Sequence, residues 1–149
     1  MNNLFEPGAA AQMKQRIGGL TPESRRVWGR MNVSQMLAHC AAAMESAVGD
    51  ARPPRLLIGR LIGPMAKRSV LGPKPMGRNA PTTPNLRIAD ERDLERERQR
   101  LMKLIDRFVA AGPAGCTTHP HTFFGSLTAD EWSRLMYKHL DHHLTQFSA

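Results

Sequence analysis

Apolar residues recur along this chain at intervals of three and four, the spacing that gives an α-helix one apolar face. The pattern is clearest in residues 91–111, where the other faces are charged and the apolar positions are Leu94, Leu101, Leu104, Ile105 and Phe108. No stretch shows the sustained alternation typical of a β-strand. The chain is also rich in Leu, Met and Ala, which favour helices over strands. The pattern therefore predicts an all-α protein.

Capping signals delimit the first two of four main helices. The first is predicted over residues 7–17, before the glycine pair at 18–19. The second is predicted over residues 33–48, with Asn32 or Ser34 as its N-cap and a glycine directly after it.

The third and fourth helices occupy the C-terminal part of the chain. The third is predicted to begin after Asp90, as its N-cap, and to end at the Gly-Pro pair at 112–113. The fourth opens with a capping box of Thr128 and Glu131 and runs to the C-terminus. Four helices with one long crossover predict a four-helix bundle, formed by residues 1–149 as a single domain.

The crossover, residues 51–89, is basic and rich in proline. It holds eight basic residues and no acidic residue. In the rest of the chain the basic and acidic residues are equal in number, so this segment carries the entire net charge of +8. Residues 55–71 within it predict a short amphipathic helix with a break near Pro64. The basic residues are Arg52, Arg55, Arg60, Lys67, Arg68, Lys74, Arg78 and Arg87.

Three interpretations of this crossover remain open. The first in order of preference is a solvated loop without a partner, and the second is a lid over a site that recruits an acidic substrate. The third is binding to nucleic acid or to an anionic membrane surface. Nucleic-acid binding is disfavoured because no aromatic residue lies between Trp28 and Phe108 to stack on bases, and no phosphate-binding P-loop is present.

Targeting features point to a cytoplasmic protein. The N-terminus lacks the basic and apolar regions of a secretory signal, and no apolar run approaches the length of a membrane span. The two cysteines, Cys40 and Cys116, are too few for a disulfide framework. Cys40 is predicted to be a small buried residue, and Trp28 and Trp132 are predicted to lie in the core.

Two histidines lie on the apolar face of the last helix. At about 100° per residue, His139 and His143 fall on the stripe that contains Trp132, Leu135, Met136 and Phe147. Histidines at i and i+4 can bind one metal ion together. The alternative is a pair of core histidines satisfied by hydrogen bonds, which needs partners for four ring nitrogens. His142 lies at the edge of the stripe.

The protease motif H-E-x-x-H is absent, because Leu140 stands where its glutamate would be. His39 is the natural third ligand, but it lies roughly 120–140° from the centre of the apolar stripe of its helix. It therefore faces either a neighbouring helix or solvent. A further cluster, Cys116, His119 and His121, predicts either a second metal site or, preferably, residues that order their loop or line the mouth of the main site.

Three segments resemble a known superfamily. They are W-G-x-M-N-V-x-Q-M-L-A-H at residues 28–39, H-P-H-T-F-F-G-S-L-T-x-x-E-W at 119–132 and Y-K-H-L-D-H-H-L-x-Q-F at 137–147. Together they resemble the DinB/YfiT-like superfamily, and most closely a branch of it classified as a domain of unknown function. Thr122 departs from this pattern, which has proline there. The resemblance covers both ends of the chain and little of residues 50–90.

The resemblance implies a four-helix bundle in which His39, His139 and His143 hold a nickel or zinc ion. It also implies relatives that are metal-dependent transferases and isomerases using low-molecular-weight thiols, with homodimers common among them. It does not define an activity for this branch.

A three-histidine site leaves at least one metal position open, which is typical of catalytic rather than structural zinc. The open position suits water or a substrate thiolate or carbonyl oxygen. We therefore expect a metal-dependent enzyme acting on a small molecule, as a thiol transferase or a hydrolase. The alternative is a non-catalytic binding protein whose basic segment 51–89 contacts an anionic partner and whose histidines are structural.

Overall fold

The computed structural model describes residues 2–149, which contain five α-helices, two short 3₁₀ turns and no strand. The all-α prediction is confirmed. The elements are α1 (Ala9–Gly18), α2 (Val33–Val48), α3 (Leu57–Val70), η1 (Pro84–Leu86), α4 (Leu94–Ala111), η2 (Pro113–Gly115) and α5 (Ala129–Gln146).

The capping signals predicted the start of α2 and of α5 correctly. The side chain of Asn32 accepts a hydrogen bond from the Gln35 amide, and the Gln35 side chain accepts one from the Asn32 amide. Thr128 and Glu131 make the same reciprocal pair before α5. Because these bonds satisfy amides that lack partners within a helix, they define where each helix begins.

The start of α4 differs from the prediction. Its N-cap is Asp93, whose carboxylate accepts a hydrogen bond of 2.7 Å from the Arg96 amide. Asp90, the predicted cap, instead pairs with Arg92. Both aspartates precede a helical pattern, but α4 begins at Leu94, so Asp93 is the residue directly before its first turn and its carboxylate reaches the amide at the third helical position.

The predicted break at Pro64 is also wrong, because α3 continues through it to Val70. Proline removes the hydrogen bond to the carbonyl four residues earlier, here that of Arg60. Both residues are exposed, so the freed carbonyl lies on a face of the helix that solvent can reach, which makes the lost hydrogen bond tolerable.

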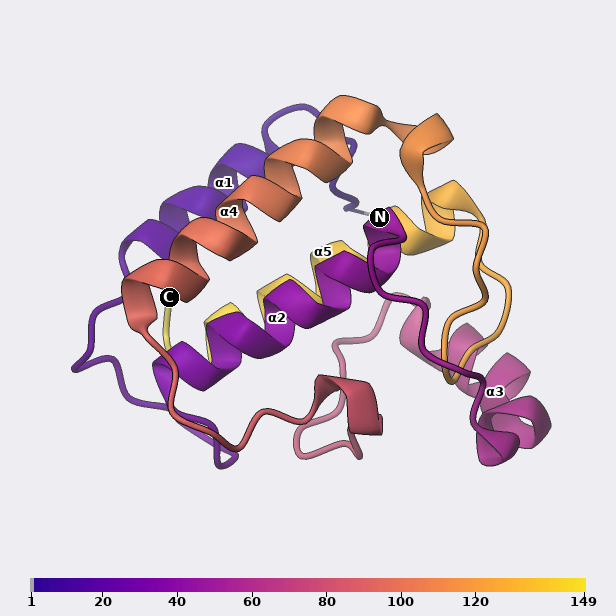
Figure 1. The fold of residues 1–149 in the computed structure, drawn as a ribbon, viewed down its shortest axis with the longest axis horizontal. Coiled ribbons are helices and arrows are strands. Elements are labelled where there is room, and N and C mark those ends of the chain that lie inside the picture. Colours follow the sequence, from indigo (N-terminus) through magenta and orange to yellow (C-terminus); the bar gives the residue numbers. More distant parts are fainter. Residues whose placement is uncertain (1) are drawn as a thin grey trace.

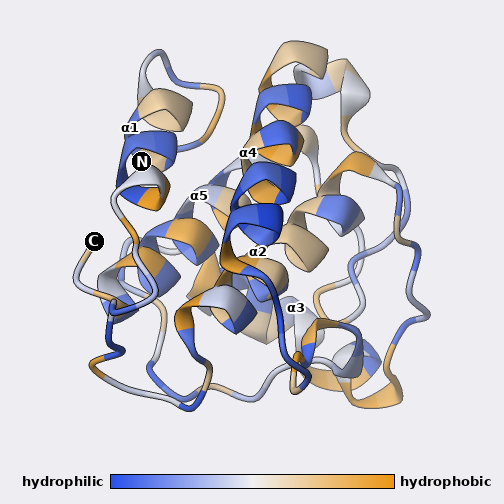
Figure 2. Ribbon diagram, turned by 60° about the vertical axis from the view of Figure 1, so that its left-hand side comes forward, coloured by the Kyte–Doolittle hydropathy of each residue, from blue (hydrophilic) through white to orange (hydrophobic). Residues whose placement is uncertain are grey.

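Helices α1, α2, α4 and α5 pack together, with α2 against both α4 and α5 and with α1 against the same two helices (Figure 1). Their apolar faces form one core, and the charged outer face of α4 is turned away from it (Figure 2). The largest fully buried side chains are Trp132, Phe108, Leu4, Met13, Ile17, Met36, Leu37, Met44, Leu101, Ile105, Leu140 and Leu144.

Helix α3 lies at the edge of the molecule (Figure 1), and it approaches the loop before α5 most closely at two glycines. Gly59 and Gly63 are its buried residues, and a Cβ atom at Gly63 would lie only 2.2 Å from the Phe123 carbonyl oxygen. Lys67 of α3 forms an ion pair of 2.7 Å with Glu131 at the start of α5. After α3, the Lys138 ammonium donates to the carbonyls of Val70, Gly72 and Lys74. These contacts attach the crossover to α5.

Ion pairs join the packed helices at their edges. Arg100 of α4 bonds Glu45 of α2 at 2.7 Å, and Arg16 of α1 bonds Asp141 of α5 at 2.7 Å. Within residues 2–149, none of the helices combines the length and apolarity that crossing a bilayer requires.

Candidate metal centre

The apolar stripe predicted for α5 is buried. Trp132, Leu135, Met136 and Phe147 all lie in the core, and His139 and His143 are buried with them. The two histidines therefore point inward, one helical turn apart, as their spacing predicted.

His39 is also buried, at 3% exposure, and so faces a neighbouring helix rather than solvent. Helix α2 has α4 on one side and α5 and η1 on others, so four consecutive residues, Ala38–Ala41, are all buried. An apolar stripe indicates only one buried face. His39 lies on a second buried face of α2, which exists because α4, α5 and η1 all pack against this helix.

The three imidazole rings converge on one point. Their centroids are separated by 4.8 Å between His39 and His139, 4.6 Å between His39 and His143, and 4.7 Å between His139 and His143. One candidate ligand atom from each ring lies within 4.8 Å of the others. The Nε2 atoms of His39 and His139 are 2.9 Å apart. Histidine nitrogens that share a tetrahedral zinc ion lie roughly 3.3 Å apart, so this group could hold a metal ion with small adjustments.

A hydrogen bond to the crossover determines which ring nitrogen of His39 carries the proton. Its Nδ1–H donates to the carbonyl oxygen of Leu86, in η1, at 2.7 Å. Because a neutral imidazole carries one proton, the Nε2 atom of His39 has an unprotonated lone pair directed at the cluster, where it lies 2.9 Å from the His139 Nε2 atom. A hydrogen bond at the far ring nitrogen is the usual device for orienting a metal-binding histidine.

The proton on His143 is placed in the same way by α5 itself. The Nδ1 atom of His143 lies 2.8 Å from the Gln146 Oε1 atom. The Gln146 amide nitrogen donates to the Trp28 carbonyl at 2.8 Å, so its oxygen is the atom that faces His143. The Nε2 lone pair of His143 is therefore free. Gly29 is part of this arrangement, since a Cβ atom there would lie 2.5 Å from the Gln146 amide nitrogen.

All three histidines are held in the neutral form that binds metals. Burial lowers the pKa of His39, and it lowers the pKa of His143 to about 3. Burial, together with the neighbouring histidines, places the pKa of His139 well below its usual value. The Nδ1 atom of His139 is buried without a hydrogen-bond partner. Three neutral imidazoles suit Zn, Ni, Cu or Fe, so the donor set fits a divalent transition metal.

Beside this group lies a cluster that the sequence did not predict, made by the half-buried Trp28 and His142 and the exposed Arg78. The Arg78 guanidinium lies 4.3 Å from the centre of the Trp28 ring, and the His142 ring lies 5.5 Å from it on α5. Trp28 is thus half-buried rather than in the core, while Trp132 is in the core as predicted. Burial lowers the pKa of His142, with Asp141 opposing and Arg78 adding to the shift.

The loop residues Cys116, His119 and His121 do not converge on a second site. The Nε2–H of His119 donates to the Pro53 carbonyl at 2.9 Å, and the Nδ1 atom of His121 accepts two backbone amides, at 3.1 Å each. His121 thus bonds the backbone of its own loop and His119 joins that loop to the crossover, in line with the preferred interpretation that they order the loop or line the mouth of the site. Within residues 2–149, the three-histidine cluster is the group of potential metal ligands that the side chains form.

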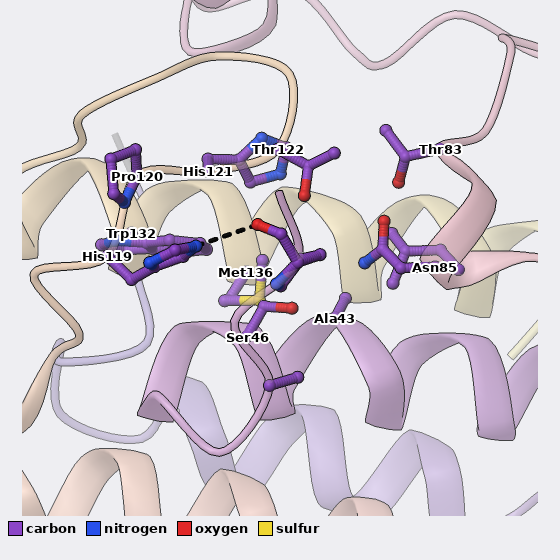
Figure 3. A pocket seen from close by; sticks show the side chains of 13 residues that line it. Ala43, Ser46, Thr83, Asn85, His119, Pro120, His121, Thr122, Trp132 and Met136 are labelled. Carbon is purple, nitrogen blue, oxygen red and sulfur yellow. Dashed lines mark hydrogen bonds between the residues drawn. The ribbon is translucent and has the colours of Figure 1, made fainter. Parts of the chain in front are cut away.

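Figure 3 shows a small pocket whose lining includes neighbours of the three-histidine cluster. Helices α2 and α5, the loop before α5 and both ends of the crossover form its walls. Leu86, whose carbonyl bonds His39, is one of the lining residues. The others are Ala43, Ser46, Ala51, Pro53, Thr83, Asn85, His119, Pro120, His121, Thr122, Trp132 and Met136.

Sequence reasoning missed the roles of Leu86, Gln146 and Trp28. Gln146 had a detectable signal, because a residue three positions after His143 lies on the same face of the helix. Leu86 and Trp28 had none, since each contributes a backbone carbonyl that any residue type provides.

The fold and the site thus define a helical protein with three buried histidines that could hold one metal ion. The chain belongs to the family described as "Protein of unknown function (DUF1569)", which it matches over residues 7–149. No curated protein matches the chain, and no solved structure does.

Proposed function

We propose that this protein is a metal-dependent enzyme in which His39, His139 and His143 hold a zinc or nickel ion. The proposal places it in the DinB-like superfamily, with α1, α2, α4 and α5 as a four-helix bundle. The observation that carries it is the convergence of three neutral imidazoles, two of which have their protons held on the far nitrogen by Leu86 and Gln146.

The competing explanation is that the histidines of this cluster have only a structural role. Buried polar groups in a structural cluster are normally satisfied within the protein. Here the Nε2 lone pairs of His39 and His143 both face the cluster, and the one hydrogen bond within it, between the Nε2 atoms of His39 and His139 at 2.9 Å, uses only one of them. A bound ion would use those lone pairs, which supports metal binding over a closed hydrogen-bond network.

Three protein ligands leave room for a substrate on the ion. When bound, such an ion supplies Lewis acidity, which lowers the pKa of a coordinated water or thiol towards neutrality. A small-molecule thiol transferase or a hydrolase is therefore the activity that we propose. The chain's own contribution is to orient the imidazoles and to exclude bulk water from a site buried between α2 and α5.

The first experiment measures metal content in protein purified without a histidine tag. We expect about one equivalent of zinc or nickel per chain, and none in the triple variant His39→Ala, His139→Ala, His143→Ala. His119→Ala is the matched control, because that histidine lies outside the cluster, and it should retain the metal. A folded parent that contains no metal and cannot be loaded with either ion would show that the cluster is structural.

Activity is then screened with metal-loaded protein. Transfer of glutathione or cysteine to an electrophile tests the thiol transferase, and release of a chromophore from carboxylic esters tests the hydrolase. Either activity should disappear in the triple variant. The resemblance to the superfamily also leads us to propose a homodimer in the cytoplasm, which light scattering and fractionation would check.

A second candidate function is favoured by the surface of α3. This helix exposes Leu57, Leu61 and Met65 at 81%, 80% and 72%, next to Arg60 and Arg68. An exposed apolar face with basic neighbours and no acidic residue is typical of a helix that lies on an anionic lipid surface.

Vesicle sedimentation tests this second candidate. Binding is expected to vesicles containing phosphatidylserine, to weaken with added salt and to fall for the double variant Leu61→Ser, Met65→Ser. Equal sedimentation with purely zwitterionic vesicles would contradict the role of the basic residues, and no sedimentation with either would exclude lipid binding.

A further inference from the structure

Arg78, in the basic crossover, is a charged side chain that the protein positions without giving it a carboxylate. Its guanidinium lies over the Trp28 ring, 4.3 Å from the ring centre. Arg16, by contrast, pairs with Asp141 at 2.7 Å. Within residues 2–149, Arg78 makes no such ion pair and no hydrogen bond. An aromatic ring therefore covers one face of the guanidinium, while its N–H donors stay available to a ligand.

The ring beneath Arg78 is itself fixed to the end of α5. The Val27 amide donates to the Gln146 carbonyl at 2.7 Å, and the Gln146 side chain donates to the Trp28 carbonyl at 2.8 Å. On the crossover side, Arg78 belongs to a turn in which Asn79 has a positive φ of 55°. Because both sides of the contact have a defined backbone, the guanidinium loses little freedom when it binds a ligand.

The same ring connects Arg78 to the three-histidine cluster. The His142 ring lies 5.5 Å from the Trp28 ring and 5.0 Å from the His143 ring, measured between centroids. Only two half-buried rings therefore separate the guanidinium from His143, one of the three histidines that we propose as metal ligands. A small molecule that spans this distance could bind the metal ion with one end and Arg78 with the other.

The charge around Trp28 favours an anionic ligand. Neither residues 24–44 nor the crossover, residues 51–89, contain an acidic residue. Asp141 precedes His142 in the sequence, but its carboxylate is paired with Arg16. The loop before α2 adds three exposed arginines, Arg25, Arg26 and Arg30. A surface with one sign of charge attracts ligands of the opposite sign.

We propose that Arg78 binds the carboxylate group of the substrate whose reacting group binds at the three-histidine cluster. The planar fork of guanidinium donors matches a carboxylate in two parallel hydrogen bonds, and one guanidinium balances its single charge. The inference rests on the proposed function. It specifies the substrate as a carboxylate-bearing small molecule, in the transferase case a thiol, and it makes Arg78 the residue that selects it.

The test compares acidic thiols with their neutral amides. The probes are 3-mercaptopropionate and 6-mercaptohexanoate, each beside its amide, so that two chain lengths bracket the distance from Arg78 to the cluster. They are titrated at constant ionic strength against zinc-loaded and metal-free protein. The readout is the indole N–H signal of Trp28 in nitrogen-15 NMR spectra, which the variant Trp28→Phe distinguishes from that of Trp132, the second tryptophan.

We expect at least one acid to shift the Trp28 signal of the zinc-loaded protein and to bind about tenfold more tightly than its amide. Arg78→Gln should reduce this preference to about twofold or less. Arg68→Gln is the matched control, since it removes the same charge from another exposed position of the crossover, and it should keep the preference. A preference that survives in Arg78→Gln, or that Arg68→Gln reduces equally, would overturn the assignment to Arg78.

The outcomes separate this inference from the proposed function. A preference for the acids that depends on Arg78, in a protein that binds no metal, would support the carboxylate site and contradict the metal-dependent enzyme. Metal binding with equal affinity for acid and amide at both lengths would overturn the inference and leave the metal centre intact. The absence of a Trp28 shift with all four probes up to about 10 mM would also overturn it.

Discussion

Helices α3 and α5 are both amphipathic in sequence, yet they bury opposite kinds of residue. In α5 the large apolar residues face the core, and the histidines on the same stripe are carried inward with them. In α3 the large apolar residues face outward, and Gly59 and Gly63 make the contact with the protein. Amphipathic spacing therefore predicts a helix and its apolar face, but the neighbouring elements decide which face is buried.

The difference has a physical reason in the space available. Helix α5 is flanked by α1 and α2, which supply apolar surface along its length. Helix α3 instead meets the backbone of the loop at Phe123 and Phe124, so closely that only glycine fits. Close backbone approach through glycines leaves the large residues of α3 on the outside, where they are available to a partner.

The largest expected effect is the loss of a buried side chain on α5. Leu135→Ala removes apolar contacts from the core and leaves a cavity, which should lower the free energy of unfolding by about 2–5 kcal/mol. Urea denaturation followed by circular dichroism measures the change. A loss below about 1 kcal/mol would mean that the α5 stripe is not packed as described.

Acid should destabilise the α5 side of the molecule through His121, which packs on Trp132. Its pKa is about 4 in the folded protein against 6.5 when exposed, so the unfolded chain takes up the proton first as the pH falls. The stability present above pH 6.5 is thus lost on acidification, by about 2 kcal/mol at pH 5.

Denaturation of metal-free protein at pH 7 and pH 5 measures this effect. His121→Asn is the control, because its side-chain oxygen can still accept the amides of Phe123 and Phe124 without titrating in this range. The pH dependence should shrink by about 2 kcal/mol in that variant. An unchanged pH dependence would show that other groups are responsible.

The next effect concerns the group that orients His143. Gln146→Leu removes the acceptor at Nδ1 and should weaken metal binding about 10–100-fold with the fold retained. Gly29→Ala should act in the same direction, since its Cβ atom would displace the Gln146 amide. Competition with a chromogenic chelator measures both affinities. Parent-like affinity in both variants would contradict the role of Gln146.

Substitution of a glycine on α3 should have a local effect. Gly63→Ala places a Cβ atom against the Phe123 carbonyl and should cost about 1–3 kcal/mol, by separating α3 from the loop. Hydrogen exchange should increase in residues 57–70 and little in α2 or α5. Increased exchange throughout the protein would show instead that α3 is integral to the core.

The smallest effect completes the comparison with Leu135. Leu61→Ala lies on the exposed face of α3 and should change the free energy of unfolding by no more than about 0.5 kcal/mol. The same denaturation experiment measures it. A loss comparable to that of Leu135→Ala would mean that the α3 surface is covered in solution, as it would be in a homodimer.

Much of the helical framework could be predicted from local signals. The N-caps at Asn32 and Thr128 and the end of α2 at Gly49 depend on residues within one turn. The sequence predicted Thr128 and Gly49 directly and Asn32 as one of two candidates with Ser34. The errors at Asp90 and Pro64 have a local origin as well. Asp90 and Asp93 both precede the apolar pattern of α4, and either suits an N-cap by residue type. Pro64 is tolerated inside α3 because the carbonyl that loses its partner is on an exposed residue.

The sequence by itself determined that the chain is helical and that His139 and His143 face inward, because both follow from one helix and its periodicity. Only the tertiary structure brought His39 to within 2.9 Å of His139, since that distance depends on how α2 packs against α5. The same holds for the Leu86 carbonyl and for the unpaired donors at Trp132 and Thr122. Periodicity along one helix says which way a residue points, whereas a site is made where elements distant in the sequence meet.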